Sequence, residues 1–211
     1  MQKEKKILAV LFIATALVIL FNAQSLARLE GITTTTDIAP TSKIIPTGVP
    51  EVYGKELSLR YDDVSPQDPA RADLTIRKLG QMDRTLSLEG EKLDRYINIL
   101  YQLHNGISCE YCCGARSIIF ENGEAACGCA HSYAMRGLAK YLLLDHGSEL
   151  TDEQILEEIG KWKVLFFPGQ MQLKAGILEE NEIEFNYINL ASNRYRGIED
   201  GQSAGGMVGG C

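Results

Sequence analysis

The cysteines are concentrated in one short segment, and this restricts the fold and chemistry of the chain more than any other feature. The 211 residues contain six cysteines, and five of them lie within 21 positions, at Cys109, Cys112, Cys113, Cys127 and Cys129. The sixth, Cys211, follows a glycine-rich stretch. Thiols gathered in this way are typical of a metal site, a set of disulfides or a redox centre. They are not distributed as core-filling side chains would be.

Two short arms carry the cluster. The first reads Cys-Glu-Tyr-Cys-Cys over 109–113, and the second reads Cys-Gly-Cys-Ala-His over 127–131. Each arm can supply two ligands from one local turn, and a predicted β-hairpin with Asn122-Gly123 at its turn would bring the arms together. The spacing therefore predicts a tetrahedral metal site, with ligands drawn from Cys109, Cys112, Cys113, Cys127, Cys129 and His131.

These six side chains exceed the four ligands of one tetrahedral ion. The plain four-thiolate set is Cys109, Cys112, Cys127 and Cys129, and Cys113 and His131 would replace members of it or support them. Zinc is the first expectation, because it takes four nitrogen or sulfur ligands in closed sites. Copper(I), which prefers soft thiolates, is the second. An iron–sulfur cluster ranks third, because an exposed cluster outside the cytoplasm would meet oxidants.

Two other interpretations of the same cysteines stay open. The six thiols could form disulfides, since exported proteins keep them. Alternatively, the Cys-x-x-Cys spacing of Cys109 and Cys112 allows thiol–disulfide exchange, which would make the protein an enzyme. Cys211 could act as an extra ligand, a resolving thiol or one half of an intermolecular disulfide.

The amino-terminal segment predicts export. Three lysines among the first six residues precede an apolar run over 7–21, which is the order of a secretory signal or a membrane anchor. Ser25-Leu26-Ala27 also resembles a signal cleavage site. We expect a single-pass protein of the cell membrane with its carboxyl-terminal part outside the cytoplasm, or an exported protein after cleavage. The formal net charge of −7 argues against nucleic acid as a partner.

The remaining chain predicts a mainly α fold. We expect a signal or anchor at 1–27, a Thr/Pro/Gly-rich linker at 28–54, a helical domain at 55–190 with a cysteine-rich loop at 107–132, and a flexible glycine-rich tail at 191–211. The class is thus a small helical domain with a cysteine-rich β-hairpin loop, preceded by an amino-terminal membrane helix.

Local signals place the helices and two weak strands. Asp68-Pro69 predicts the start of one helix, and Ser87 predicts the N-cap of a second. The residues from Thr151 to Gln154 predict a capping box at the start of another. Apolar stripes predict helices over 87–104 and 131–146, and a last one that Pro168 closes. Weak alternation suggests short strands at 57–64 and 183–187.

Two family resemblances rest on the cysteine segments. The stretches Tyr-Cys-Cys-Gly at 111–114 and Cys-Gly-Cys-Ala-His-Ser at 127–132 resemble the exported PCYCGC-motif cysteine-rich proteins, although the Cys-Tyr-Cys-Gly-Cys order is not contiguous here. This resemblance implies membrane attachment and a metal site. A Cys-x-x-Cys followed by a two-helix hairpin, over 132–145 and 151–163, is similar to the membrane-anchored thiol oxidoreductases of cytochrome c maturation. That resemblance implies redox-active thiols, but this loop is longer and carries three additional cysteines.

Overall fold

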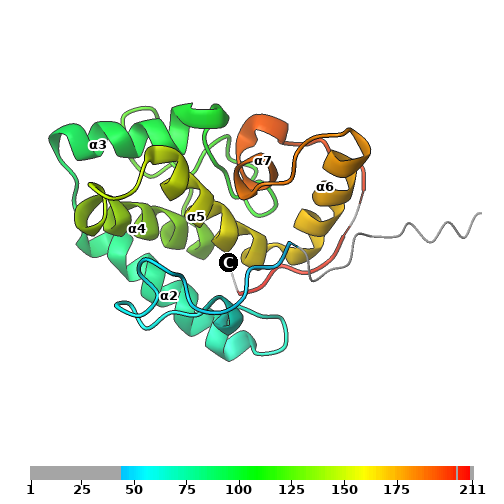
Figure 1. Cartoon of the computed structure of the whole chain (residues 1–211), viewed down its shortest axis with the longest axis horizontal. Coiled ribbons are helices and arrows are strands. Elements are labelled where there is room, and N and C mark those ends of the chain that lie inside the picture. The colour runs from blue at the N-terminus through cyan, green and yellow to red at the C-terminus, as the bar shows by residue number, and fades with distance from the viewer. Residues whose placement is uncertain (1–43, 203, 210–211) are drawn as a thin grey trace, which may run out of the picture. The chain divides into compact units, whose positions relative to one another are not determined.

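The computed structural model describes residues 44–202 and 204–209, and this part of the chain is mainly helical, as predicted (Figure 1). The predicted membrane helix within residues 1–27 lies outside the described residues. Among the helices that the structure describes, none is long and apolar enough to cross a bilayer.

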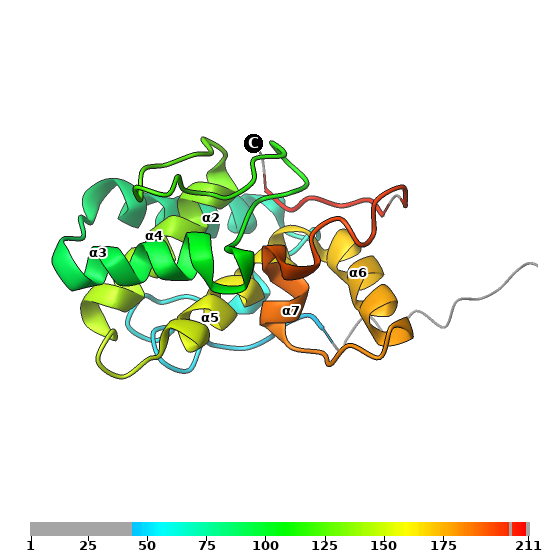
Figure 2. The same ribbon diagram turned by 90° about the horizontal axis from the view of Figure 1, so that it is seen from above.

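The described helices are mostly short and follow one another closely along the chain. Helix α4 lies between α2 and α3 with α5 beside it, and α6 and α7 lie at the other end of the helical body (Figures 1 and 2). In chain order they are η2 (Tyr61–Asp63), α2 (Pro69–Thr85), α3 (Gly90–Ile97), η3 (Asn98–Gln102), η4 (Leu103–Asn105), α4 (Ala130–Asp145), α5 (Asp152–Phe166), α6 (Pro168–Glu180), α7 (Tyr187–Ala191) and η5 (Asn193–Tyr195).

Capping residues begin two helices where the sequence predicts them. Asp68 accepts a hydrogen bond from the Arg71 amide at the start of α2, where Pro69 is the first helical residue. Thr151 and Gln154 form the complete reciprocal capping box of α5. The expected cap at Ser87 is wrong, because α3 begins after Glu89, which makes no side-chain cap. Gly90 there adopts a positive φ of 54°.

Helices α2 and α4 cross closely at glycine positions. A Cβ atom on Gly137 of α4 would lie 2.1 Å from the Leu79 carbonyl oxygen of α2, closer than any side-chain carbon can stand. Gly80 of α2 in turn faces the Tyr133 side chain of α4. Small residues at both positions allow the two backbones to approach, and ten of the sixteen residues of α4 are buried. Cys129 is the N-cap residue of this helix, and His131 lies in its first turn.

Several local predictions differ from the structure. Neither 57–64 nor 183–187 forms a strand: the first contains turns and the 3₁₀ helix η2, and the second leads without regular structure into α7. Pro168 ends α5 as predicted, but it also starts α6 at its first position, where the missing amide hydrogen costs nothing. The predicted hairpin is reduced to a turn and one isolated β-bridge between Ile119 and Ala125.

Residues 44–54, which the sequence assigns to the linker, pack against the helical body. Tyr53 is fully buried, and its hydroxyl group accepts a hydrogen bond from the Trp162 indole at 2.7 Å. The same hydroxyl and that of Tyr61 both donate to one carboxylate oxygen of Glu158 on α5. A polar anchor of this kind cannot be read from the composition of the segment, which is why it was predicted to be a linker.

Buried tyrosines predict alkaline destabilisation of the domain. Burial raises the pKa of Tyr53, Tyr61, Tyr96 and Tyr111 above the ordinary value of 10.0. The folded state therefore keeps these protons above pH 10 while the unfolded chain loses them. The contribution of these tyrosines to stability is fully present below pH 10. Above pH 10 the free energy of unfolding should fall by about 1.4 kcal/mol per pH unit for each such tyrosine. Chemical denaturation at a series of alkaline pH values measures this slope, and a flat profile would contradict it.

Candidate metal centre

The backbone of the cysteine loop brings the two arms together through one central residue. Ile118 donates its amide hydrogen to the Ile107 carbonyl at 3.0 Å and accepts at its own carbonyl from the Ala126 amide at 3.1 Å. Cys109 follows Ile107 by two residues, and Cys127 follows Ala126 by one. The turn between the arms forms at Asn122-Gly123 as predicted: Gly123 has φ of 86°, and the Asn122 side chain accepts from the Glu124 amide.

Three sulfur atoms meet at the amino-terminal end of α4. The Cys109 and Cys129 sulfurs are 3.1 Å apart, and those of Cys127 and Cys129 are 3.6 Å apart. All three sulfurs lie within 4.8 Å of one another, which is close enough to hold one metal ion. Sulfurs around a tetrahedral zinc with ~2.3 Å bonds are about 3.8 Å apart, so the Cys109–Cys129 pair needs to open by about 0.7 Å and the Cys127–Cys129 pair by about 0.2 Å.

Cys129 occupies the N-cap position of α4, and this explains how its sulfur is held. It accepts a hydrogen bond from the Ser132 amide at 3.4 Å, and the Ser132 hydroxyl oxygen lies 3.3 Å from it. The same hydroxyl oxygen is 3.0 Å from the Cys109 sulfur. An N-cap sulfur near unpaired amides sits at the positive end of the helix, where negative charge is favoured.

The close sulfurs shift one another's pKa values in opposite directions. Hydrogen bonding from Cys109, together with contacts from His131 and Ser132, lowers the pKa of Cys129 well below that of an ordinary thiol. The hydrogen bond to Cys129, with burial, raises the pKa of Cys109. Burial and a hydrogen bond with Cys113 raise the pKa of Cys127 to about 11. These opposite directions favour negative charge on Cys129 over its two neighbours.

His131 is fully buried beside the cluster. Its ring packs 4.9 Å from each of the rings of Phe166 and Phe167, and its Nε2 lies 2.8 Å from the Val208 carbonyl oxygen. A carbonyl oxygen only accepts, so Nε2 carries the proton in this contact. His131 also lies within 4.8 Å of the ligand atoms of Cys112 and Cys129, which forms a second overlapping group.

The glycine-rich tail supplies this contact to His131. Val208 is buried, and its amide donates to the Phe166 carbonyl at 2.9 Å at the end of α5. The segment 204–209, drawn in red, runs past the junction of α5 and α6 (Figure 2). Val208 of the stretch predicted to be flexible is therefore packed beside His131, whereas residues 205–207 are exposed.

The two remaining loop cysteines are in different states. Cys113 is an exposed free thiol beside Cys127, whereas Cys112 is disulfide-bonded. Cys109, Cys127 and Cys129 are also free thiols. The Cys112 sulfur lies within 4.8 Å of the ligand atoms of Cys129 and His131. Cys211 lies outside the described residues.

A buried group of four charged side chains adjoins Cys109. The Glu110 carboxylate lies 3.1 Å from the Lys163 ammonium group and 3.6 Å from that of Lys174. Both lysines are fully buried, and Lys174 also lies 3.8 Å from Glu199. Burial lowers the pKa of Lys163 to about 8. Glu110 further accepts from the Gly197 amide, so this ion group ties the first arm of the cysteine loop to α5, α6 and the segment after η5.

Arg136 of α4 ties down the second arm from beneath. Its guanidinium is 99% buried, and it donates to the carbonyl oxygens of Ile118 at 3.1 Å and Cys127 at 2.8 Å. Asp83 of α2 balances its charge at 2.8 Å. A planar fork with several donors is suited to holding two loop carbonyls and a carboxylate together.

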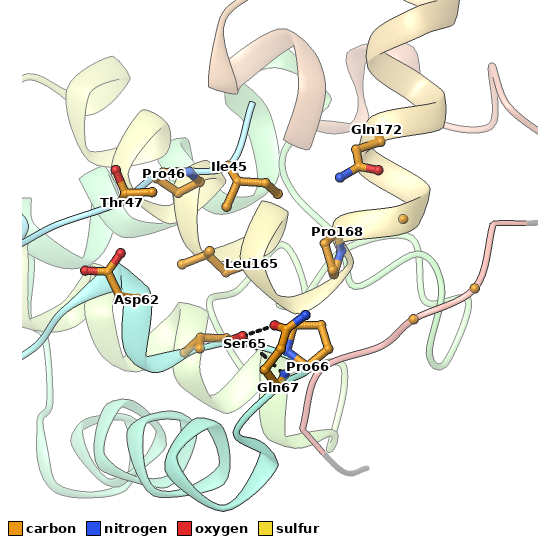
Figure 3. A pocket seen from close by; sticks show the side chains of 14 residues that line it. Ile45, Pro46, Thr47, Asp62, Ser65, Pro66, Gln67, Leu165, Pro168 and Gln172 are labelled. Atoms are coloured by element: carbon orange, nitrogen blue, oxygen red, sulfur yellow. Dashed lines mark hydrogen bonds between the residues drawn. The ribbon is translucent and has the colours of Figure 1, made fainter. Parts of the chain in front are cut away.

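A separate cleft of about 550 Å³ opens between the turn at 64–67 and the start of α6 (Figure 3). Its lining combines apolar side chains, such as Leu165 and Pro168, with neutral polar ones, such as Thr47 and Gln67. Among the described residues that line it, Asp62 is the one charged side chain. The cleft has none of the sulfur or imidazole ligands of the cysteine cluster, so its chemistry does not compete with the metal centre as the candidate site.

Sequence reasoning missed the side chains that support the sulfurs. Ser132, three residues after an N-cap cysteine, occupies the position whose amide a capping side chain takes, and this spacing was a usable signal. Lys163 interrupts the apolar run Trp162 to Phe167, and a lysine there signals a buried ionic partner. Nothing in the sequence indicated that the Val208 carbonyl would contact His131.

Comparison of the chain with protein-family models, with curated proteins and with solved structures finds no match. The functional argument therefore rests on the residues of the cluster and their geometry.

Proposed function

We propose that this protein is a membrane-tethered extracytoplasmic protein that binds a thiophilic metal ion, zinc in the first place, at the cysteine loop. One observation carries the proposal: three free thiols from two separate arms converge within 4.8 Å of one another. Thiols that only fill a core do not need to converge in this way. Structural zinc sites bind the ion with four sulfur or nitrogen ligands.

The ligand set follows from the state of each cysteine. Cys109, Cys127 and Cys129 supply three sulfurs, and exposed Cys113 beside Cys127 is the available fourth. His131 offers an alternative fourth ligand through Nδ1. A closed site would make the metal structural, whereas a site that leaves Cys113 accessible favours capture and handover of the ion. Copper(I) is the competing metal, because it too prefers thiolates.

Metal affinity is expected to fall as the pH is lowered. Binding displaces the protons of Cys109 and Cys127, whose pKa values are raised, so acid competes with the metal. The apparent dissociation constant should rise by about tenfold per pH unit for each displaced proton. Competition with a chromogenic chelator between neutral and mildly acidic pH measures this in the full-length chain. An affinity that does not change with pH would contradict thiol ligation.

Membrane tethering is the second part of the proposal, and it is supported by the lysine-flanked apolar run at 7–21. The full chain is expected to sediment with membranes and to resist extraction by high salt. Deletion of residues 1–27 should move the protein to the soluble fraction. Recovery of the intact chain in the soluble fraction at full length would contradict a tether.

A further inference from the structure

We propose a second activity for the metal-free loop: Cys129 and Cys109 form a thiol–disulfide exchange pair that reduces a disulfide bond in a small molecule or peptide. The proposal is independent of the metal, because it concerns the cluster when no ion occupies it. It also assigns a pair different from the Cys-x-x-Cys spacing, in which Cys112 is already disulfide-bonded.

The distance between the two sulfurs is the first support. Cys109 and Cys129 stand 3.1 Å apart, and a covalent bond requires a closing movement to about 2.05 Å. Cys127, at 3.6 Å from Cys129, is farther away and lies only two residues from it along the chain. A disulfide between arms therefore needs less rearrangement than one within the second arm.

The exposures of the two sulfurs give them different roles. Cys109 is fully buried, whereas Cys129 is only partly buried at the N-cap of α4. Cys129 is thus the more accessible of the two residues to an incoming disulfide. The Ser132 amide donates to the Cys129 sulfur at 3.4 Å and so holds this sulfur at the start of α4. Cys109 is then placed to attack the Cys129 sulfur of the adduct and so resolve it.

The exchange has two balanced steps. The Cys129 thiolate attacks one sulfur of the substrate disulfide; a mixed S–S bond forms, the substrate S–S bond breaks, and the first substrate thiolate leaves. Cys109 then attacks the Cys129 sulfur; the Cys109–Cys129 bond forms, and the second substrate thiolate leaves with the proton that Cys109 loses. The two cysteines give up two electrons in total, and the substrate disulfide takes up both.

The pair of single-cysteine variants separates these roles in the full-length, metal-stripped chain. The protein is mixed with oxidised glutathione, quenched with an alkylating reagent and mapped by tandem mass spectrometry. The native chain should give a Cys109–Cys129 link and release two glutathione thiols per link. In Cys109→Ser, the glutathione adduct on Cys129 should accumulate to at least about tenfold its native level, because no buried thiol resolves it. In Cys129→Ser, Cys109 should carry no adduct.

Three results would overturn the proposal. They are a native chain in which a stable adduct stays on Cys129 without the link, a link between Cys127 and Cys129 in its place, or an adduct on Cys109 in the Cys129→Ser variant. Circular dichroism of each variant confirms that the fold is retained before mapping. Since no metal is present in the assay, a failure of metal binding leaves this test unaffected, and a failure of exchange leaves the proposed metal site standing.

Discussion

Replacing Glu110 with glutamine is expected to lower the free energy of unfolding by about 3–5 kcal/mol. The side chain keeps its shape in this variant but loses the charge that faces two fully buried lysines. Lys163 and Lys174 lie 3.1 Å and 3.6 Å from the Glu110 carboxylate, and only Glu199 remains near Lys174. Removing one partner from a buried ion pair leaves a charge that neither water nor protein compensates.

Lys174 makes this cost larger than the distances suggest. Its ammonium group is buried with no hydrogen bond, although it lies within 4 Å of both carboxylates. It depends on nearby negative charge alone. Urea denaturation followed by circular dichroism measures the effect, with Glu124→Gln on the exposed hairpin turn as the matched control. A loss below about 1 kcal/mol for Glu110→Gln would show that the ion group does not hold the loop.

A double-mutant cycle distinguishes lost charge compensation from lost packing. Lys163→Met removes one of the two buried lysines, and the combination with Glu110→Gln leaves Lys174 with its partner Glu199 at 3.8 Å. The double variant is expected to recover part of the stability lost in Glu110→Gln, because a buried charge has been removed. Simple addition of the two single losses would contradict coupling between the two side chains.

Replacing Cys129 with serine is expected to weaken zinc binding by at least about 100-fold. The variant removes the one sulfur that contacts both other sulfurs of the cluster, at 3.1 Å and 3.6 Å. Serine is itself a preferred N-cap residue, so α4 should still begin at the same place and the fold should persist. A hydroxyl oxygen is a poor ligand for a thiophilic ion, which makes the loss specific to metal binding.

Cys113→Ser is the matched comparison for this variant. It removes a sulfur from the same loop but leaves the three clustered sulfurs in place, so its loss of affinity should be smaller. Competition with a chelator of known affinity measures both variants in one titration. Zinc affinity that stays within about threefold of the native value in Cys129→Ser would exclude Cys129 as a ligand.

Much of the fold could be predicted because its signals are local. Asp68 with Pro69 and Thr151 with Gln154 begin helices through contacts within one turn, and Asn122-Gly123 requires a turn by its own backbone preference. The weak strands failed because alternation over a few residues has no partner strand to pair with. The apolar contacts of the domain come from helices instead. One of these is α6, a helix that the sequence did not indicate.

The cluster could be predicted in part, and the limit is again physical. The two arms and the turn between them were sufficient to expect that Cys109, Cys127 and Cys129 would meet. The positions of the remaining ligands depend on long-range contacts. Glu110, next to Cys109, pairs with lysines from two helices, and His131 contacts a carbonyl oxygen 77 residues away. Such contacts leave no periodic or spacing signal in the chain.

The most direct test of the account is the metal content and ligation of the full-length chain, purified without chelators and without air. Elemental analysis combined with X-ray absorption is expected to find about one equivalent of zinc per chain, with sulfur neighbours at about 2.3 Å. Less than about a tenth of an equivalent of any transition metal, with the loop thiols still freely reactive after zinc is added, would contradict a metal centre at the cysteine loop.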